Sequence, residues 1–188
     1  ALNHLKDKPL RIGTGETIDS LSLDEISLYS QELITFFRSY PRWRLEFKTK
    51  SNKVDQFLET PHAGNVIVSW SINPQNIIES EEHGTSSLEE RLRAAHKCID
   101  KGFLVSFHID PMIWHPQWKQ SYAELIEAIT QHFRPAQIPY LSVGALRFQP
   151  EQRWMMRERF GFKSYVTTAE VFPGKDGKLR YDQGVREE

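Results

Sequence analysis

Short apolar segments alternate with amphipathic segments at least five times along this chain, and that alternation limits the folds open to it. The apolar segments are rich in β-branched residues, so we expect strands at 10–14, 44–50, 65–71, 103–110 and 138–146. Such an order favours parallel strands with crossover helices over a sandwich or a bundle. We therefore expect an α/β fold, a partial (β/α) barrel of about five parallel strands with outer helices, with a doubly wound sheet as the alternative.

The segments between the strands show helical spacing of their apolar residues. The first predicted helix begins near Asp24, ends at Pro41 and carries an apolar stripe of Ile26, Tyr29, Leu33, Phe36 and Tyr40. A capping-box pattern, Ser87 with Glu90 or Ser86 with Glu89, opens another helix that Gly102 ends. Further helices are expected at 53–58, 116–133 and 150–160, and 165–172 is expected to be extended.

A length of 188 residues suits one domain with a sizeable core, and we expect a lead-in at 1–9 and a single domain at 10–188. No apolar run approaches the roughly 20 residues that span a bilayer. The net charge of −1 argues against a generally basic nucleic-acid binder. Cys98, the single cysteine, excludes an internal disulfide and favours a reducing, cytoplasmic location.

Polar residues follow the predicted strands at their carboxyl ends, where parallel α/β folds carry their sites. The stretch 10–21 ends an apolar run at two glycines with a carboxylate directly after them. Over the five strands, the candidate residues at this rim are Thr14, Gly15, Glu16, Lys50, Ser51, Ser71, Asn73, His108, Asp110, Gly144 and Arg147. Such a rim suits a zwitterionic ligand, with Glu16 facing an ammonium and Lys50 or Arg147 facing a carboxylate or phosphate.

Two histidines and a carboxylate near the fourth strand, His108, Asp110 and His115, form a candidate site for a divalent metal. The alternative is that His108 packs below the rim and His115 begins the next helix. No fixed-spacing zinc motif accompanies them, and that favours the alternative. Cys98 lies one position off the apolar stripe of its helix, so we expect a partly buried thiol.

Several of these motifs, taken in order, resemble the radical S-adenosylmethionine enzymes, and within them the spore photoproduct lyase-like (DNA repair photolyase-like) branch. The resemblance runs from about residue 10 to 181. Its motifs are Arg11-Ile12-Gly13-Thr14-Gly15-Glu16 with Asp19-Ser20-Leu21, Phe47-Lys48-Thr49-Lys50, Ser71-Ile72-Asn73-Pro74, the helix start 84–91, Pro111-Met112-Ile113-Trp114-His115 with Trp118, and Gly144-Ala145-Leu146-Arg147-Phe148.

The resemblance implies a partial barrel with S-adenosylmethionine at the strand ends. Gly15 and Glu16 stand at the Gly-Glu position that meets the methionine amino group, and Lys50 and Ser71 stand where spore photoproduct lyases contact the cofactor. Asn73 belongs to the same expected cofactor-binding set. The implied chemistry is reductive cleavage of S-adenosylmethionine and hydrogen abstraction from a substrate. The lyase uses a cysteine where this chain has Glu16, so the resemblance implies a sister activity rather than thymine-dimer repair.

The family's first barrel strand and its Cys-x-x-x-Cys-x-x-Cys loop, which holds a [4Fe-4S] cluster, would precede residue 10, and no cysteine lies there. We therefore expect an incomplete barrel, part of a larger enzyme, that is inactive by itself. The strand at 10–14 would then be an open edge, which favours either a dimer through that edge or an N-terminal segment folded over it. Catalytic residues are not assignable from the sequence.

Two other functions remain open: a non-catalytic barrel remnant acting as a binding module, and a metal-dependent hydrolase. Nucleic acid is an open candidate partner beside S-adenosylmethionine. Two basic groups are relevant to it: Arg42, Arg44, Lys48, Lys50 and Lys53, and the group Arg153, Arg157, Arg159 and Lys163 with Trp154 and Phe160 between them. Basic residues interleaved with aromatic ones suit a phosphate backbone and stacked bases. A solvated helix face is the favoured interpretation, given the neutral overall charge.

Overall fold

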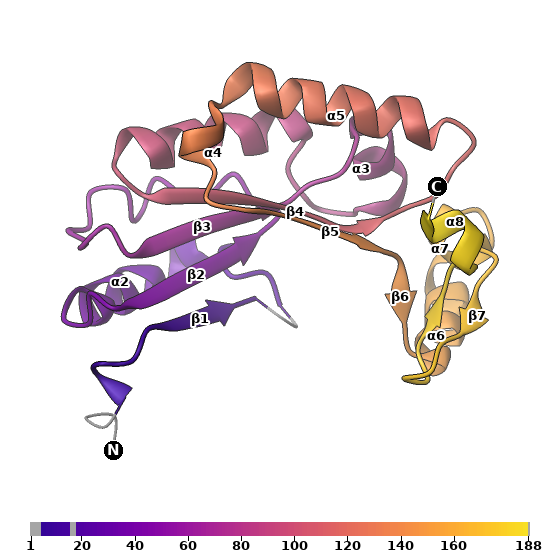
Figure 1. Ribbon diagram of the computed structural model, residues 1–188, viewed down its shortest axis with the longest axis horizontal. Coiled ribbons are helices and arrows are strands. Elements are labelled where there is room, and N and C mark those ends of the chain that lie inside the picture. Colours follow the sequence, from indigo (N-terminus) through magenta and orange to yellow (C-terminus); the bar gives the residue numbers. More distant parts are fainter. Residues whose placement is uncertain (1–4, 16–17, 188) are drawn as a thin grey trace.

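Five parallel strands form the main sheet in the computed structural model, which describes residues 5–15 and 18–187. The strands are β1 (Leu10–Thr14), β2 (Trp43–Thr49), β3 (Val66–Ser71), β4 (Leu104–Met112) and β5 (Leu141–Ala145), and they lie in sequence order. Each strand pairs in parallel with the next. The sheet curves as a half-barrel, and α4 (Leu88–Asp100) and α5 (Trp118–His132) cover its outer face (Figure 1). The predicted partial barrel is confirmed.

Alternating side chains explain how the sheet has an apolar outer face and a polar inner face. On β3, Val66, Val68 and Trp70 are completely buried against the helices. The alternate residues Ile67, Ser69 and Ser71 point to the opposite side, which is the inside of the half-barrel. The same alternation continues on β4, so the core lies between sheet and helices while polar groups gather on the concave side.

The predicted helix at 24–40 is two helices, α1 (Asp24–Ser27) and α2 (Tyr29–Arg38). Leu28 separates them with a left-handed backbone, φ 53°. This break rotates the second helix, so Ile34 and Phe37 are buried while Phe36 is exposed; Ile26 of α1 is exposed as well. The predicted stripe was wrong at these positions, because it assumed one uninterrupted helical phase.

The helix α4 begins with the predicted capping box, in which Ser87 and Glu90 exchange hydrogen bonds. Cys98 of this helix is completely buried rather than partly buried, because Ala94, Ala95 and Cys98 together face the sheet. Burial raises the pKa of the Cys98 thiol. Arg91 is also fully buried, and its guanidinium pairs with Glu82 at 2.6 Å.

Two further differences concern short segments. A helix that the sequence did not predict, α3 (Gln75–Glu81), follows Pro74, whereas the predicted helix at 53–58 is a series of turns. A short 3₁₀ segment, η2 (Pro135–Gln137), links α5 to β5. Local propensity misjudged these segments because tertiary contacts, rather than their own sequence, set their backbone.

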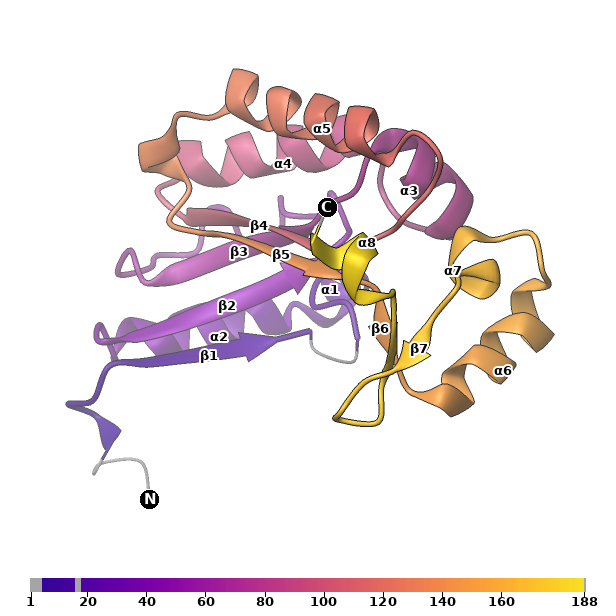
Figure 2. The ribbon, with the colours of Figure 1, turned by 45° about the vertical axis from the view of Figure 1, so that its right-hand side comes forward.

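A smaller C-terminal unit lies beyond the carboxyl ends of the strands (Figure 2). It holds a three-stranded antiparallel sheet of β6 (Arg147–Phe148), β8 (Leu179–Arg180) and β7 (Phe172–Pro173). Its helices are α6 (Pro150–Phe160), α7 (Tyr165–Thr168) and α8 (Gln183–Glu187). The segment 165–172 was predicted as extended, and this was wrong for α7, whose amino end is capped by Ser164.

Within the described residues, β1 pairs only with β2, so its other edge is open. The segment before β1 contacts the sheet, since the Trp43 indole donates to the Leu5 carbonyl at 3.1 Å. A dimer through the open edge stays a prediction, as does the division into a lead-in and a single domain. No helix in the described part of the chain is long and apolar enough to cross a membrane.

Candidate functional site

A polar cavity of about 290 Å³ opens at the carboxyl ends of β1 to β4. Eight residues line it: Gly15, Ile18, Asp19, Lys48, Thr49, Lys50, Ser71 and Asp110. The parallel order of the strands brings these residues together from the carboxyl ends of four strands and the loops that follow β1 and β2. The lining has two ammonium and two carboxylate groups. A ligand that carries charges of both signs matches it best.

Asp19 organises the lip of this cavity. Its Oδ1 accepts hydrogen bonds from the backbone N–H groups of Leu21 at 2.9 Å and Ser22 at 3.0 Å, and from the Thr49 hydroxyl at 2.7 Å. Its Oδ2 accepts from the Lys50 N–H at 2.5 Å. One carboxylate thus joins the loop after β1 to the loop after β2. These hydrogen bonds hold the backbone of Lys50 in place and so position its side chain at the cavity.

Gly15 lies where only glycine fits. Its φ is +88°, and a Cβ at this position would come within 2.5 Å of the Ser20 hydroxyl and 2.6 Å of the Lys48 carbonyl. The Ser20 N–H donates to that same carbonyl at 3.1 Å. Any side chain would push the loop off β2. The glycine therefore lets the backbone close tightly over the cavity.

Lys50 extends its ammonium from the end of β2 into a sheltered position. Burial lowers the pKa of Lys50, and the nearby charge of Glu82 opposes that shift. Within the described residues, its Nζ has no hydrogen-bond partner. An ammonium held in this way is available to a carboxylate or phosphate of a ligand. Ser71 lies beside it on β3, and its carbonyl accepts from the Arg91 guanidinium at 2.8 Å.

The structure brings together three of the five predicted cofactor-binding residues, Gly15, Lys50 and Ser71. Glu16 lies outside the described residues. Asn73 does not line the cavity: its amide oxygen accepts from the Tyr122 hydroxyl at 2.8 Å, and its amide nitrogen donates to Glu82 at 3.1 Å. The chain turns into α3 at this point, and the Asn73 side chain is turned inward and is only 3% exposed.

The candidate metal ligands are not brought together. His108 contacts Ser142 and Glu46 inside the half-barrel, whereas the two Arg147 Nη atoms each donate a hydrogen bond of 2.8 Å to the Asp110 carboxylate. His115 is buried, and burial lowers its pKa. No group of three His, Cys, Asp or Glu side chains in the described part of the chain is arranged to hold a metal ion. The residues point in different directions because a strand end and a loop separate them.

Sequence reasoning missed Asp19 and Lys48 as cavity residues. The signal for Lys48 was present, because it shares a strand face with Lys50 at a spacing of two. Asp19 looked like an ordinary turn residue, but two of its four hydrogen bonds reach across to Thr49 and Lys50 at the end of β2, which a single sequence does not show. The need for glycine at position 144 was also not evident from the sequence. A Cβ there would lie 2.8 Å from side-chain atoms of Asp110 and Arg147, so a larger residue would disturb that ion pair.

Comparison with known proteins agrees with this geometry. The family model for spore photoproduct lyase matches residues 2–170. A spore photoproduct lyase from Geobacillus sp. is 28% identical over 146 residues, which is 77% of this chain and 43% of that protein. The Bacillus subtilis spore photoproduct lyase is 31% identical over 113 residues, which is 60% of this chain and 33% of that protein.

Solved structures extend the match to the fold. A spore photoproduct lyase mutant with bound AdoMet (S-adenosylmethionine) and dinucleoside spore photoproduct has a TM-score of 0.82 and 26% identity, covering 94% of this chain and 54% of that one. A second lyase structure, complexed with dinucleoside spore photoproduct, has the same TM-score and 25% identity. This chain spans about half the length of these relatives. It belongs to the spore photoproduct lyase family.

Proposed function

We propose that this chain forms the AdoMet-binding part of a radical S-adenosylmethionine enzyme related to spore photoproduct lyase. The observation that carries the proposal is the cavity in which Gly15, Lys50 and Ser71 meet at the carboxyl end of the sheet. A relative of the same fold was solved with AdoMet bound. The cavity volume of about 290 Å³ fits part of a ligand of that size, with the rest extending over the rim.

The charges of the cavity suit AdoMet, which carries an ammonium, a carboxylate and a sulfonium. Lys50 is placed to bind the carboxylate, because burial favours its pairing with an anion. The carboxylates of Asp19 and Asp110 also line the cavity but already have partners within the protein, and Gly15 lets its loop close over the cavity. Bound AdoMet would supply the adenosyl group that this enzyme class uses for hydrogen abstraction.

A [4Fe-4S] cluster does not fit the residues of this chain. Such a cluster needs several thiolates, whereas the sequence holds one cysteine, and Cys98 is buried under the sheet with a raised pKa. The proposed enzyme needs cluster ligands from outside these 188 residues. By themselves these residues are expected to bind AdoMet without converting it to 5′-deoxyadenosine.

For the substrate, we propose a nucleic acid. Lyase structures of this fold were solved with a dinucleoside spore photoproduct, and this supports the class. Glu16, in place of the lyase's hydrogen-donating cysteine, favours a different lesion or modification over thymine-dimer repair. Binding of a DNA oligonucleotide at two salt concentrations tests this part. Affinity that does not fall with salt would count against a phosphate contact.

Equilibrium dialysis with radiolabelled AdoMet tests the cofactor site. Lys50→Met keeps the length of the side chain and removes its charge, and we expect affinity to fall roughly tenfold or more, as for the loss of a sheltered charge-assisted hydrogen bond. Lys53→Met is the matched control, since Lys53 lies nearby but pairs on the surface with Glu25 at 2.6 Å. Equal affinity for both variants, or no binding by the unmodified chain, would overturn the proposal.

A further inference from the structure

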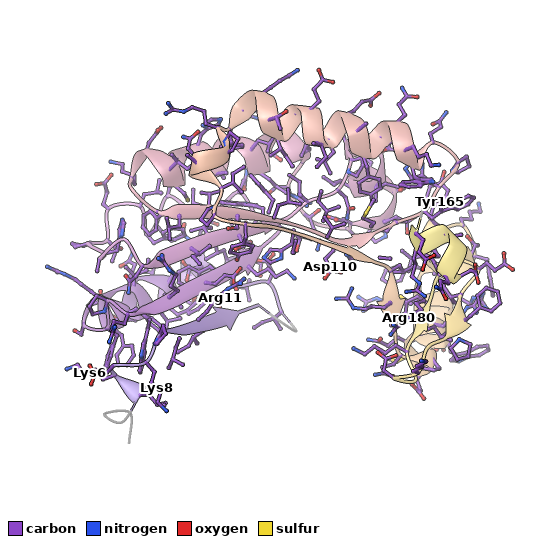
Figure 3. The ribbon with its side chains drawn as sticks, in the orientation of Figure 1. Lys6, Lys8, Arg11, Asp110, Tyr165 and Arg180 are labelled. Carbon is purple, nitrogen blue, oxygen red and sulfur yellow. The ribbon has the colours of Figure 1, made fainter. Side chains whose placement is uncertain are left out.

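A second polar cluster lies inside the half-barrel, on the side of the sheet away from α4 and α5. Its centre is Glu46 of β2, which accepts hydrogen bonds from Ser69, His108, Tyr140 and Arg11. Arg11, which is labelled in Figure 3, belongs to β1 and lies on this side of the sheet. The AdoMet-binding proposal makes no use of this cluster.

Three members of the cluster form a line of hydrogen bonds. The Ser142 hydroxyl lies 2.5 Å from His108 Nδ1. The other ring nitrogen, His108 Nε2, lies 3.1 Å from Glu46 Oε1. A hydroxyl, an imidazole and a carboxylate in that order are the nucleophile, base and orienting group of serine hydrolases.

The protonation of this line follows from its chemistry. Burial alone would raise the pKa of Glu46, but the hydrogen bonds from His108, Ser69, Tyr140 and Arg11 outweigh it and lower the pKa to about 2. An ionised carboxylate only accepts hydrogen bonds, so His108 Nε2 carries the hydrogen and donates it. His108 Nδ1 is then left with its lone pair, and it accepts the Ser142 proton. Of the two neutral tautomers, the hydrogen bond to Glu46 selects the one in which Nδ1 can act as a base.

Solvent exposure differs among the three residues of this hydrogen-bonded line. Glu46 is 5% and His108 9% exposed, so the base and its partner are shielded from water. Ser142 is half-buried, so the nucleophile is less shielded than the base. The Arg11 side chain is 48% exposed beside them, with its guanidinium over the Tyr140 ring at 4.3 Å. Its Nε donates to Glu46 Oε2 at 2.6 Å, so Arg11 helps to hold the orienting carboxylate.

We propose that Ser142, His108 and Glu46 form a second catalytic site that hydrolyses carboxylic esters. The Ser142 oxygen attacks the ester carbonyl as His108 Nδ1 takes its proton, and collapse of the tetrahedral adduct breaks the bond to the leaving alcohol, which receives that proton. Water then attacks the acyl–Ser142 ester, with His108 again as base. The products are a carboxylic acid and an alcohol, and one water is consumed.

Covalent labelling tests the nucleophile directly. A fluorophosphonate should attach to Ser142, as located by mass spectrometry of the peptides. His108→Gln and Glu46→Gln should slow labelling roughly a hundredfold or more, because general-base assistance is lost. Ser80→Ala is the control, since Ser80 lies exposed on α3, and it should label at the rate of the unmodified chain. No label on Ser142 in folded protein would overturn the proposal.

A cysteine variant gives a second readout that does not depend on an ester substrate. Ser142→Cys places a thiol beside His108, and we expect iodoacetamide to alkylate it faster than a free thiol at neutral pH. The background is low, because Cys98 is completely buried with a raised pKa. Adding His108→Gln should remove the acceleration. An alkylation rate that is the same with and without His108 would show that the hydrogen bonds serve only the fold.

Discussion

The half-barrel has a much larger buried core than the C-terminal unit has. The half-barrel shares one core in which many side chains, including Trp70 and Phe107, are completely buried. The core of the C-terminal unit has four buried residues, Leu146, Phe148, Ala169 and Tyr181. Its longest helix, α6, has no buried residue, and Trp154 on it is 73% exposed.

Both proposed sites lie in the better-packed region. Lys50, Glu46 and His108 are carried by β2 and β4, whose outer faces are buried against helices. Precise placement of reacting groups needs such support. Ser142 is carried by β5, where Leu141 and Val143 are exposed. The C-terminal unit is joined to the half-barrel by polar contacts, among them Glu81 of α3, which accepts from the Tyr165 N–H at 2.8 Å and caps α7. This unit is expected to open before the half-barrel does.

The largest effect is expected from the core of the half-barrel. Phe107→Ala should lower the free energy of unfolding by about 3–5 kcal/mol, because it leaves a cavity between sheet and helices. Urea unfolding followed by circular dichroism measures this. A loss below about 1 kcal/mol would mean that the sheet is less tightly packed than the structure shows.

The buried carboxylate should give the half-barrel a distinct acid response. The folded pKa of Glu46 is lowered from 4.5 to about 2, so its contribution is complete above about pH 4.5 and is lost as the pH falls toward 2. We expect about 2 kcal/mol after allowance for solvent screening. The measurement is the difference in unfolding free energy between the unmodified chain and Glu46→Gln across that range. A difference that stays constant with pH would contradict the assignment.

A smaller and local effect is expected at the junction. Glu81→Gln removes the charge that caps α7, which should cost about 1 kcal/mol. Hydrogen exchange should accelerate at 165–168 while the amides of β3 keep their protection. If exchange rises equally in both regions, the two units unfold together and the contrast between them fails.

The smallest effect is expected on α6. Trp154→Ala should change the free energy of unfolding by less than about 0.5 kcal/mol, because the indole buries little surface in the described structure. Thermal unfolding compared with Phe107→Ala gives the contrast directly. A large loss would show that another part of the protein, or a second molecule, covers this helix.

Much of the half-barrel was predictable because its periodicities are strong. The strand 10–14 was predicted with its observed bounds, and the capping box of Ser87 and Glu90 marked the start of α4. Strand ends, read together with the family resemblance, predicted Gly15, Lys50 and Ser71 as cofactor-binding residues, and these three line one cavity. The predictions were wrong where the local sequence pattern was ambiguous. Leu28 is an example, because the spacing of apolar residues does not indicate its left-handed backbone.

The sequence by itself determined the parallel sheet, the rim at which its polar residues gather and the family, because these depend on spacing along the chain. Only the tertiary structure decided what each polar side chain faces. Asn73 and His108 were both predicted at the rim. In the structure Asn73 donates a hydrogen bond to Glu82, and His108 lies between Ser142 and Glu46. Hydrogen-bond partners that lie 62 residues apart, as His108 and Glu46 do, become neighbours only when the sheet curves.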